Sequence, residues 1–417
     1  MRRNVLILVV VECLFGLSFG VYELAFPLFL DDNGVRIETI GLVLAAGAAV
    51  NFLIVVHGGR LADRFGRKGI YGLNYLALGV VSAATPLVPH VAYLTVLKTL
   101  QQACTSLSRS LRGVLVYESV KVERFTRVFG QVVGLETTCH TLGFACVGFA
   151  GIGTGAALSY RGLFLIGGAA LAAAAILFAV LFREVRVSAP TEVVRLSLRT
   201  LFAFDLHHKL YLIIAAGFII GVGFGISHAV WMLYFRRQLE GPWAGDLAGF
   251  DAWLRAVWPR LAAVWTGGEQ GAQFALISLI AILHRLMMGV PMFFLAPLLT
   301  RRFKGLYVAA MAVQGLVIAA PAVVDWTTGS FLLVTVAWVI HDMLGASVWV
   351  PIQERFIQQY SRPQRRAADV AKAKALMALG LVLGVALAGP VMAVDPALPF
   401  FVGGGLISLA SLILIPL

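Results

Sequence analysis

Ionisable side chains lie inside long apolar runs of this sequence, at spacings that place several of them on one face of a helix. The pairs concerned are Glu12 and Glu23, eleven residues apart, Arg109 and Arg112, three apart, and Glu136 and His140, four apart. Residues three, four or eleven positions apart share one helix face. A charge at the centre of a bilayer costs at least about 2.5–3.5 kcal/mol on insertion scales, so each of these groups needs a partner or a function.

Three more ionisable groups of this kind are His228, Arg285 and Asp342. Histidines titrate near neutral pH and intramembrane carboxylates serve in proton relays, so both suit proton coupling. Neighbouring arginines suit the capture of a carboxylate or phosphate group. Structural ion pairs, or snorkelling of Glu12 and Arg112 to the membrane surface, are alternatives that the sequence leaves open.

The composition indicates that lipid is the main solvent of this chain. Hydrophobic residues make up 60% and charged residues 13% of its 417 residues, with a mean hydropathy of +0.89, whereas soluble proteins carry about 45–50% apolar and about 25% charged residues. Apolar segments long enough to cross about 30 Å of hydrocarbon predict an all-α integral membrane protein with twelve transmembrane helices. The predicted spans are 4–30, 38–58, 69–89, 91–119, 127–155, 161–182, 209–235, 272–299, 305–324, 328–351, 372–394 and 397–415.

The basic residues give these spans an orientation. If the N-terminus lies in the cytoplasm, most of the 33 lysines and arginines fall in cytoplasmic loops, as the positive-inside rule requires. We therefore expect a multi-pass protein of the bacterial cytoplasmic membrane with both termini inside. The net charge of +12 then reflects orientation and anionic lipid headgroups, and the scatter of basic residues over short loops disfavours nucleic-acid binding.

Two connections are longer than the others and divide the chain. Residues 183–208 contain no continuous apolar run, which predicts a cytoplasmic linker between a six-helix bundle at 1–182 and a second at 209–417. Residues 236–271 are expected on the outer face. From Leu247 to Trp265 their apolar positions follow helical spacing, which predicts an amphipathic helix at the membrane interface.

The loop after the second predicted span carries a ten-residue motif, GRLADRFGRK at Gly59–Lys68. It resembles the signature loop of the major facilitator superfamily (G-x-L-A-D-R-x-G-R-[RK]) at every fixed position and in the same topological place. The resemblance implies two pseudo-symmetric six-helix bundles, with helices 1, 4, 7 and 10 lining a central cavity. Independently of it, Gly59 would let a helix approach closely and Gly66 would permit a tight turn.

The resemblance also implies a gate at this loop. Asp63 would face the start of the eleventh helix and Arg67 would reach Glu118, and these contacts would close the cytoplasmic side. A degraded copy of the motif lies in the second half of the chain, where it ends in Lys304-Gly305-Leu306-Tyr307 and has Thr300 at the position of Asp63. Glu354, after the tenth span, corresponds to Glu118 after the fourth. The predicted gating residues are Gly59, Asp63, Arg64, Gly66, Arg67, Lys68, Glu118 and Glu354.

These features predict a secondary active transporter that moves a small solute by alternating access. Proton coupling and an organic or phosphorylated anion as the solute fit the charges in the spans. We find no GxSxG, HExxH or GxxxxGK[ST] motif, so neither an enzyme nor an ATP-driven pump is expected. No cofactor or metal site is predicted, since the four cysteines form no CxxC pair, and the expected state is a monomer. Export of hydrophobic compounds or lipids, or a non-transporting receptor or assembly role, are the alternatives.

Overall fold

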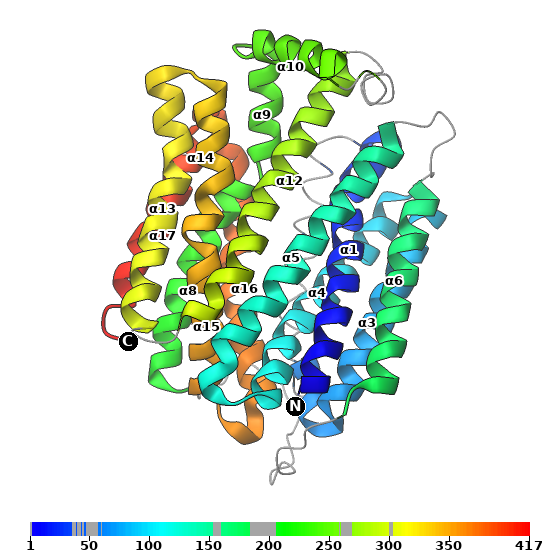
Figure 1. Ribbon diagram of the computed structural model, residues 1–417, viewed down its shortest axis with the longest axis vertical. Helices are drawn as coiled ribbons and strands as arrows, with labels where there is room; N and C mark the ends of the chain where they lie inside the picture. Colours follow the sequence, from blue (N-terminus) through cyan, green and yellow to red (C-terminus); the bar gives the residue numbers. More distant parts are fainter. Residues whose placement is uncertain are drawn as a thin grey trace.

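The computed structural model describes residues 2–35, 39, 43, 46, 57–59, 61–152, 160–183, 206–257, 259, 269–299 and 303–417. Within these ranges all regular secondary structure is helical (Figure 1). Eight helical segments in the described ranges are long and apolar enough to cross a membrane. The chain is thus an all-α membrane protein, and the count of twelve helices stays a prediction.

The helices of the first part of the chain follow the predicted spans closely. They are α1 (Arg2–Asp32), α3 (Arg67–Ala84), α4 (Val91–Ser119), α5 (Val122–Ile152) and α6 (Tyr160–Leu181). The short 3-10 helix η1 (Thr85–Leu87) extends α3. The predicted span at 38–58 lies almost wholly outside the described residues, and so do positions 184–205 of the predicted linker.

The described second part of the chain contains more helices than predicted spans, because two spans are interrupted and a further helix lies in the predicted amphipathic segment. Its helices are α8 (His208–His228), α9 (Trp231–Glu240), α10 (Ala244–Val257), α12 (Glu269–Leu295), α13 (Phe303–Thr328), α14 (Phe331–Leu344), α15 (Ala346–Tyr360), α16 (Arg366–Val394) and α17 (Leu398–Ile413). Short 3-10 helices, η2 (Ala296–Leu298) and η3 (Pro363–Arg365), follow α12 and precede α16.

Both interruptions correct the predicted spans. The span at 209–235 breaks at Ala229 and Val230, and the next helix continues to Glu240. The span at 328–351 breaks at Gly345, where the side chain of Gln314 packs so close that a Cβ would lie 2.1 Å from its Cβ. Because α15 then continues to Tyr360, the prediction that Glu354 follows this span is wrong.

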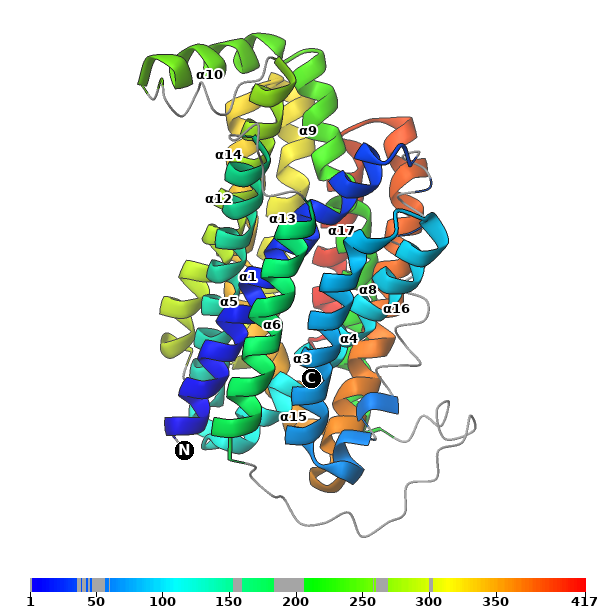
Figure 2. The ribbon, with the colours of Figure 1, turned by 90° about the vertical axis from the view of Figure 1, so that its right-hand side faces the viewer.

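The helices form two groups, and one side of each group packs against the other group. In one group α1 packs on α5 and α6, and α3 packs on α6; in the other, α8 packs on α16 and α17, and α13 on α14 and α17. The groups contact each other through α5 with α12 and through α4 with α16 (Figures 1 and 2). The contact between α5 and α12 needs glycine, because a Cβ at Gly134 would lie 2.7 Å from the carbonyl oxygen of Gly289.

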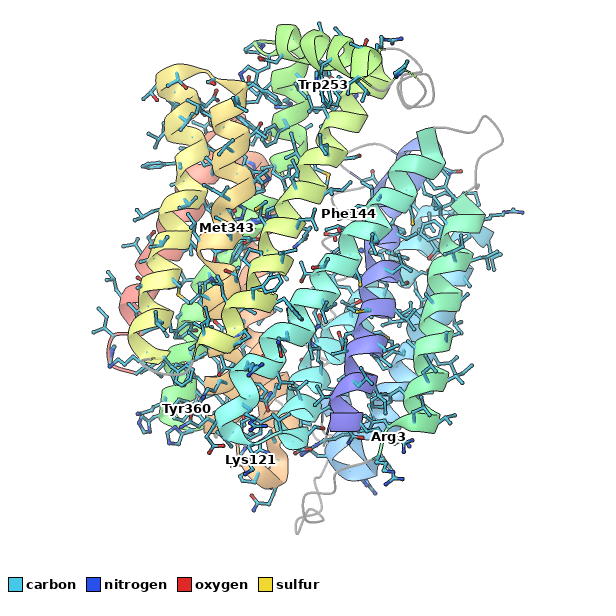
Figure 3. The ribbon with its side chains drawn as sticks, in the orientation of Figure 1. Arg3, Lys121, Phe144, Trp253, Met343 and Tyr360 are labelled. Atoms are coloured by element: carbon cyan, nitrogen blue, oxygen red, sulfur yellow. The ribbon has the colours of Figure 1, made fainter. Side chains whose placement is uncertain are left out.

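Helix α10 lies across the end of the bundle farthest from the N-terminus (Figures 1 and 2). Leu247 and Leu254 are buried on it, whereas the charged Asp246 and Arg255 are exposed, as expected of an amphipathic helix. The apolar Trp253 and Val257 are exposed as well. Figure 3 places Trp253 at this end and Arg3, Lys121 and Tyr360 at the other. Residues 258 and 260–268, the rest of the predicted amphipathic segment, lie outside the described ranges.

Candidate functional site

The loop between the second and third predicted spans binds the start of α16. Asp63 Oδ2 accepts a hydrogen bond from the backbone N–H of Ala368 at 2.9 Å, and Oδ1 accepts one from Ala367 at 3.3 Å. These amides belong to the first turn of α16, whose N–H groups have no partner within the helix and whose dipole favours a negative charge. Burial raises the pKa of Asp63, although Arg67 and the two amides act in the opposite direction.

Arg67, the first residue of α3, joins Asp63 to Glu118. Its Nη2 lies 2.8 Å from Asp63 Oδ1, and its Nη1 forms an ion pair with Glu118 at the end of α4. Arg366 approaches the same carboxylate from the other helix group, with Nη1 3.5 Å from Glu118 Oε1. We call Asp63, Arg67, Glu118 and Arg366, with the first turn of α16, the latch.

The other residues of the motif surround the latch. A Cβ at Gly59 would lie 2.6 Å from Ala371 Cβ in α16, so glycine permits this close approach. Gly66 has a φ of 99° immediately before α3, a conformation that favours glycine. Arg64 is exposed beside Phe65, and Lys68 is half-buried in the first turn of α3. The degraded copy at Thr300 lies outside the described residues.

A second polar contact between the helix groups involves Glu354. Its Oε2 lies 2.8 Å from Lys374 Nζ in α16, and Lys374 also donates to the backbone carbonyl of Arg109 in α4 at 3.0 Å. A Cβ at Gly113 would lie 1.9 Å from Glu354 Oε1, so Glu354 also packs directly on α4. Lys374 was not among the predicted site residues, although its position at the start of an apolar run was a usable signal.

Four of the predicted intramembrane charges lie together inside the first helix group. Arg112 Nη1 is 2.8 Å from Glu12 Oε2 and 3.2 Å from Glu136 Oε2, and Arg109 Nη2 is 3.9 Å from Glu136 Oε1. These contacts tie α4 to α1 and α5. Glu12 also accepts hydrogen bonds from Tyr71 and Tyr75 of α3, two tyrosines that the analysis missed despite their helical spacing of four.

Glu23, His140 and Arg285 form a separate cluster, which joins the two helix groups. Glu23 Oε2 in α1 lies 2.7 Å from His140 Nε2 in α5, and Glu23 Oε1 lies 3.5 Å from Arg285 Nη2 in α12. The Arg285 side chain is 27% exposed, and that of Arg109 is 42% exposed. Two partly exposed guanidinium groups, one from each helix group, can bind an anion.

The remaining predicted residues, His228 and Asp342, lie inside the second helix group. His228 Nε2 is 3.3 Å from His341 Nε2, and Asp342 Oδ2 is 2.9 Å from His284 Nε2. Asp342 Oδ1 accepts a hydrogen bond from Gln314 at 2.8 Å. The structure thus brings His228 and Asp342 together with His284 and His341, with Arg285 next to His284 in α12.

Comparison with known proteins agrees with this architecture. The family model described as the Major Facilitator Superfamily matches residues 8–240. No curated protein matches the chain significantly.

Several solved transporter structures share its fold over 99% of both chains. The human organic anion transporter MFSD10 (TETRAN) has 15% sequence identity and a TM-score of 0.74. A bacterial homologue of the iron transporter ferroportin has 12% identity and a TM-score of 0.71, and the nucleoside transporter NupG has 13% identity and 0.65. The family match covers more than half of the chain, and the chain therefore belongs to the major facilitator superfamily of multi-pass membrane transporters.

Proposed function

We propose that this protein is a secondary active transporter that moves a small solute by alternating access between its two helix groups. The observation that carries the proposal is the latch. Asp63 in one group binds the first turn of α16 in the other, and Arg366 of the second group approaches Glu118 of the first. A solute path at this end opens only when these contacts break. The family and the transporter structures that share the fold support this function.

The latch lies on the cytoplasmic side in this proposal. The N-terminus is at the same end of the bundle as Lys121 and Tyr360 (Figure 3), and most basic residues are expected there. The positive-inside rule assigns such an end to the cytoplasm. In the proposed transport cycle, the closed latch would block exchange of solute with the cytoplasmic side.

The proposed solute is a small organic or phosphorylated anion. Arg109 and Arg285 come from different helix groups and are partly exposed, whereas Arg112 is buried between two carboxylates. A solute bound between the groups would therefore meet Arg109 and Arg285 first. The likeness to an organic anion transporter is one of fold, so the proposal rests on the arginines.

Glu23 supplies the proposed coupling to protons. Its carboxylate holds Arg285 at 3.5 Å and His140 at 2.7 Å. An anion must compete with Glu23 for Arg285, and protonation of Glu23 removes that competitor. A proton on Glu23 and an anion on Arg285 would then bind together, which corresponds to symport.

The test is uptake by the purified protein in proteoliposomes, with labelled organic and phosphorylated anions and with or without an inward proton gradient. We expect a proton gradient to stimulate uptake of at least one anion. Arg285→Ala should weaken that anion's binding about 10- to 100-fold, because hydrogen bonds to charged groups contribute about 1.5–3 kcal/mol. Glu23→Gln should transport without stimulation by the gradient.

Arg161→Ala is the matched control, because Arg161 is exposed at the start of α6. It should transport as the wild type does. Uptake that survives Arg285→Ala unchanged would remove the anion proposal. If hydrophobic compounds move and anions do not, the export alternative replaces it. If no solute moves under any gradient, the protein is a non-transporting member of its family.

A further inference from the structure

Three histidines and one aspartate meet inside the second helix group, away from the latch and next to Arg285, which directly follows His284. His228 is the last residue of α8, His284 belongs to α12, and His341 and Asp342 belong to α14. One ring nitrogen of each histidine lies within 4.8 Å of the corresponding nitrogens of the other two. His284, His341 and Asp342 are buried. We call these four residues the histidine cluster.

Hydrogen bonds at the outer sides of two rings define which nitrogen carries the proton. His341 Nδ1 contacts the backbone carbonyl of Trp338, which only accepts, so Nδ1 must donate. The Ser227 hydroxyl donates to the carbonyl of Gly223 and lies 3.0 Å from His228 Nδ1, so it accepts from that nitrogen. In the neutral form, each ring therefore presents the lone pair of its Nε2 to the cluster.

These two lone pairs face each other, and either a proton or a metal ion between them removes their repulsion. The two Nε2 atoms are 3.3 Å apart. Two nitrogens bound at 2.0–2.1 Å to one tetrahedral ion are about 3.3 Å apart. The separation therefore matches that of two ligands of a single ion. The contact of His341 Nδ1 with a backbone carbonyl is also the usual support of a metal-binding histidine.

His284 and Asp342 supply the remaining ligands. His284 Nε2 is buried and lies 2.9 Å from Asp342 Oδ2, yet among the described residues it has no hydrogen-bond partner. Asp342 Oδ1 is 3.4 Å from His341 Nε2 and is held by Gln314, which accepts from Trp349. Three imidazoles and one hydrogen-bonded carboxylate make a complete donor set for four-coordinate binding.

We infer that His228, His284, His341 and Asp342 form a binding site for one divalent transition-metal ion, of the class represented by Zn²⁺ and Co²⁺. Neutral imidazole and carboxylate ligands suit such ions, whereas Mg²⁺ and Ca²⁺ prefer oxygen ligands. The site goes beyond the proposed transport function and does not depend on it.

The position of the site in the fold agrees with ion binding. His228 precedes the break between α8 and α9, and Asp342 lies three residues before the break at Gly345. Ion sites of transporters are typically built where membrane helices are interrupted near the midplane. Met343, next to Asp342, lies at mid-height in the bundle (Figure 3). All four ligands belong to one helix group, so the ion would join α8, α12 and α14 and leave the latch free to open.

The test is metal binding by the purified full-length protein in detergent, after removal of any affinity tag and treatment with a chelator. Equilibrium dialysis against Zn²⁺, followed by elemental analysis, should give one tightly bound ion per chain. Co²⁺ should give the visible absorption of a four-coordinate site, and Zn²⁺ should abolish it. Zn²⁺ should also raise the melting temperature of the wild-type protein, a readout that needs no variant.

His284→Gln and Asp342→Asn, made separately, should each weaken binding at least about tenfold, as even loss of a supporting partner does. His90→Gln is the control, because His90 is exposed between α3 and α4, and it should bind as the wild type does. The inference is overturned if the wild type retains no ion and shows no thermal shift. It is also overturned if both cluster variants bind as tightly as the wild type, which would indicate an adventitious ion only.

Discussion

Replacement of Asp63 by asparagine removes the negative charge of this side chain and keeps its shape. The Asp63 carboxylate accepts hydrogen bonds from Ala367 and Ala368 and pairs with Arg67. Asparagine keeps one acceptor oxygen, so the contact with Ala368 becomes a neutral hydrogen bond, and the contact with Ala367 is lost because the NH2 group of asparagine only donates. Charged hydrogen bonds contribute about 1.5–3 kcal/mol and neutral ones about 0.5–1.5 kcal/mol, so the first contact loses about 1 kcal/mol and the second about 2 kcal/mol, a total of about 3 kcal/mol.

This loss applies only to the closed state, because the contacts to α16 do not exist when the helix groups separate. A change of about 3 kcal/mol corresponds to about 150-fold in an equilibrium constant. We therefore expect Asp63→Asn to raise the ratio of open to closed molecules at the latch end about 150-fold. Distances between spin labels, measured by double electron–electron resonance, report this ratio directly.

Labels at Lys121→Cys and Gln364→Cys suit the measurement. Both positions are exposed at the latch end, one in each helix group, and the four native cysteines are first replaced by serine. Asp246→Asn on the exposed surface of α10 is the matched control and should leave the distances unchanged. Identical distance distributions for Asp63→Asn and the wild type would refute the reasoning that Asp63 holds the two groups together.

Three further variants test the packing and polar contacts within and between the helix groups. Arg112→Met should destabilise the protein by about 3–5 kcal/mol, because it leaves Glu12 buried without its cation and Glu136 with only the more distant Arg109. Thermal unfolding in detergent measures this, and a loss below about 1 kcal/mol would contradict it. Gly289→Ala places a Cβ 2.8 Å from the carbonyl oxygen of Gly134 and should lower the free energy of unfolding by about 1–3 kcal/mol. Gly249→Ala is the control and should leave the stability unchanged, because its Cβ would meet no atom within 4 Å. Lys374→Met removes the hydrogen bond to the backbone carbonyl of Arg109, which contributes about 1 kcal/mol. It should therefore raise the ratio of open to closed molecules about fivefold in the same spin-label measurement. An unchanged ratio would show that this contact does not hold the groups together.

The helices could be predicted from the sequence because hydrocarbon permits few alternatives. A long apolar segment must satisfy its backbone internally, and a helix does so within one segment. The predicted span at 91–119 has the same limits as α4, and the span at 397–415 nearly those of α17. The breaks at Val230 and Gly345 were missed because apolar sequence continues beyond each of them, although His228 and Asp342 precede them. At Gly345 the cause is the packing of Gln314, which belongs to another helix.

The predicted charges could be selected from the sequence, but most of their partners could not. Spacing along one helix related Glu136 to His140, and Arg109 to Arg112. The loop motif indicated Asp63 and Arg67, with Glu118 as their partner. The contact of Arg285 with Glu23 joins residues 262 positions apart, and no local pattern relates them. The same holds for the histidine cluster, whose members come from three helices. The expectation of no metal site followed from short sequence motifs, which do not report such clusters.

The contacts between the helix groups obey the two-fold repeat of the fold. If the second half repeats the first, the second helix corresponds to the eighth and the fifth to the eleventh. The close approach of Gly59 to α16 joins the second helix to the eleventh, and that of Gly134 to α12 joins the fifth to the eighth. The two contacts are thus equivalent under the repeat, and each depends on glycine. At these glycines backbone packs against backbone, which in the proposed transport cycle would help the groups to turn against each other once the polar latch has opened.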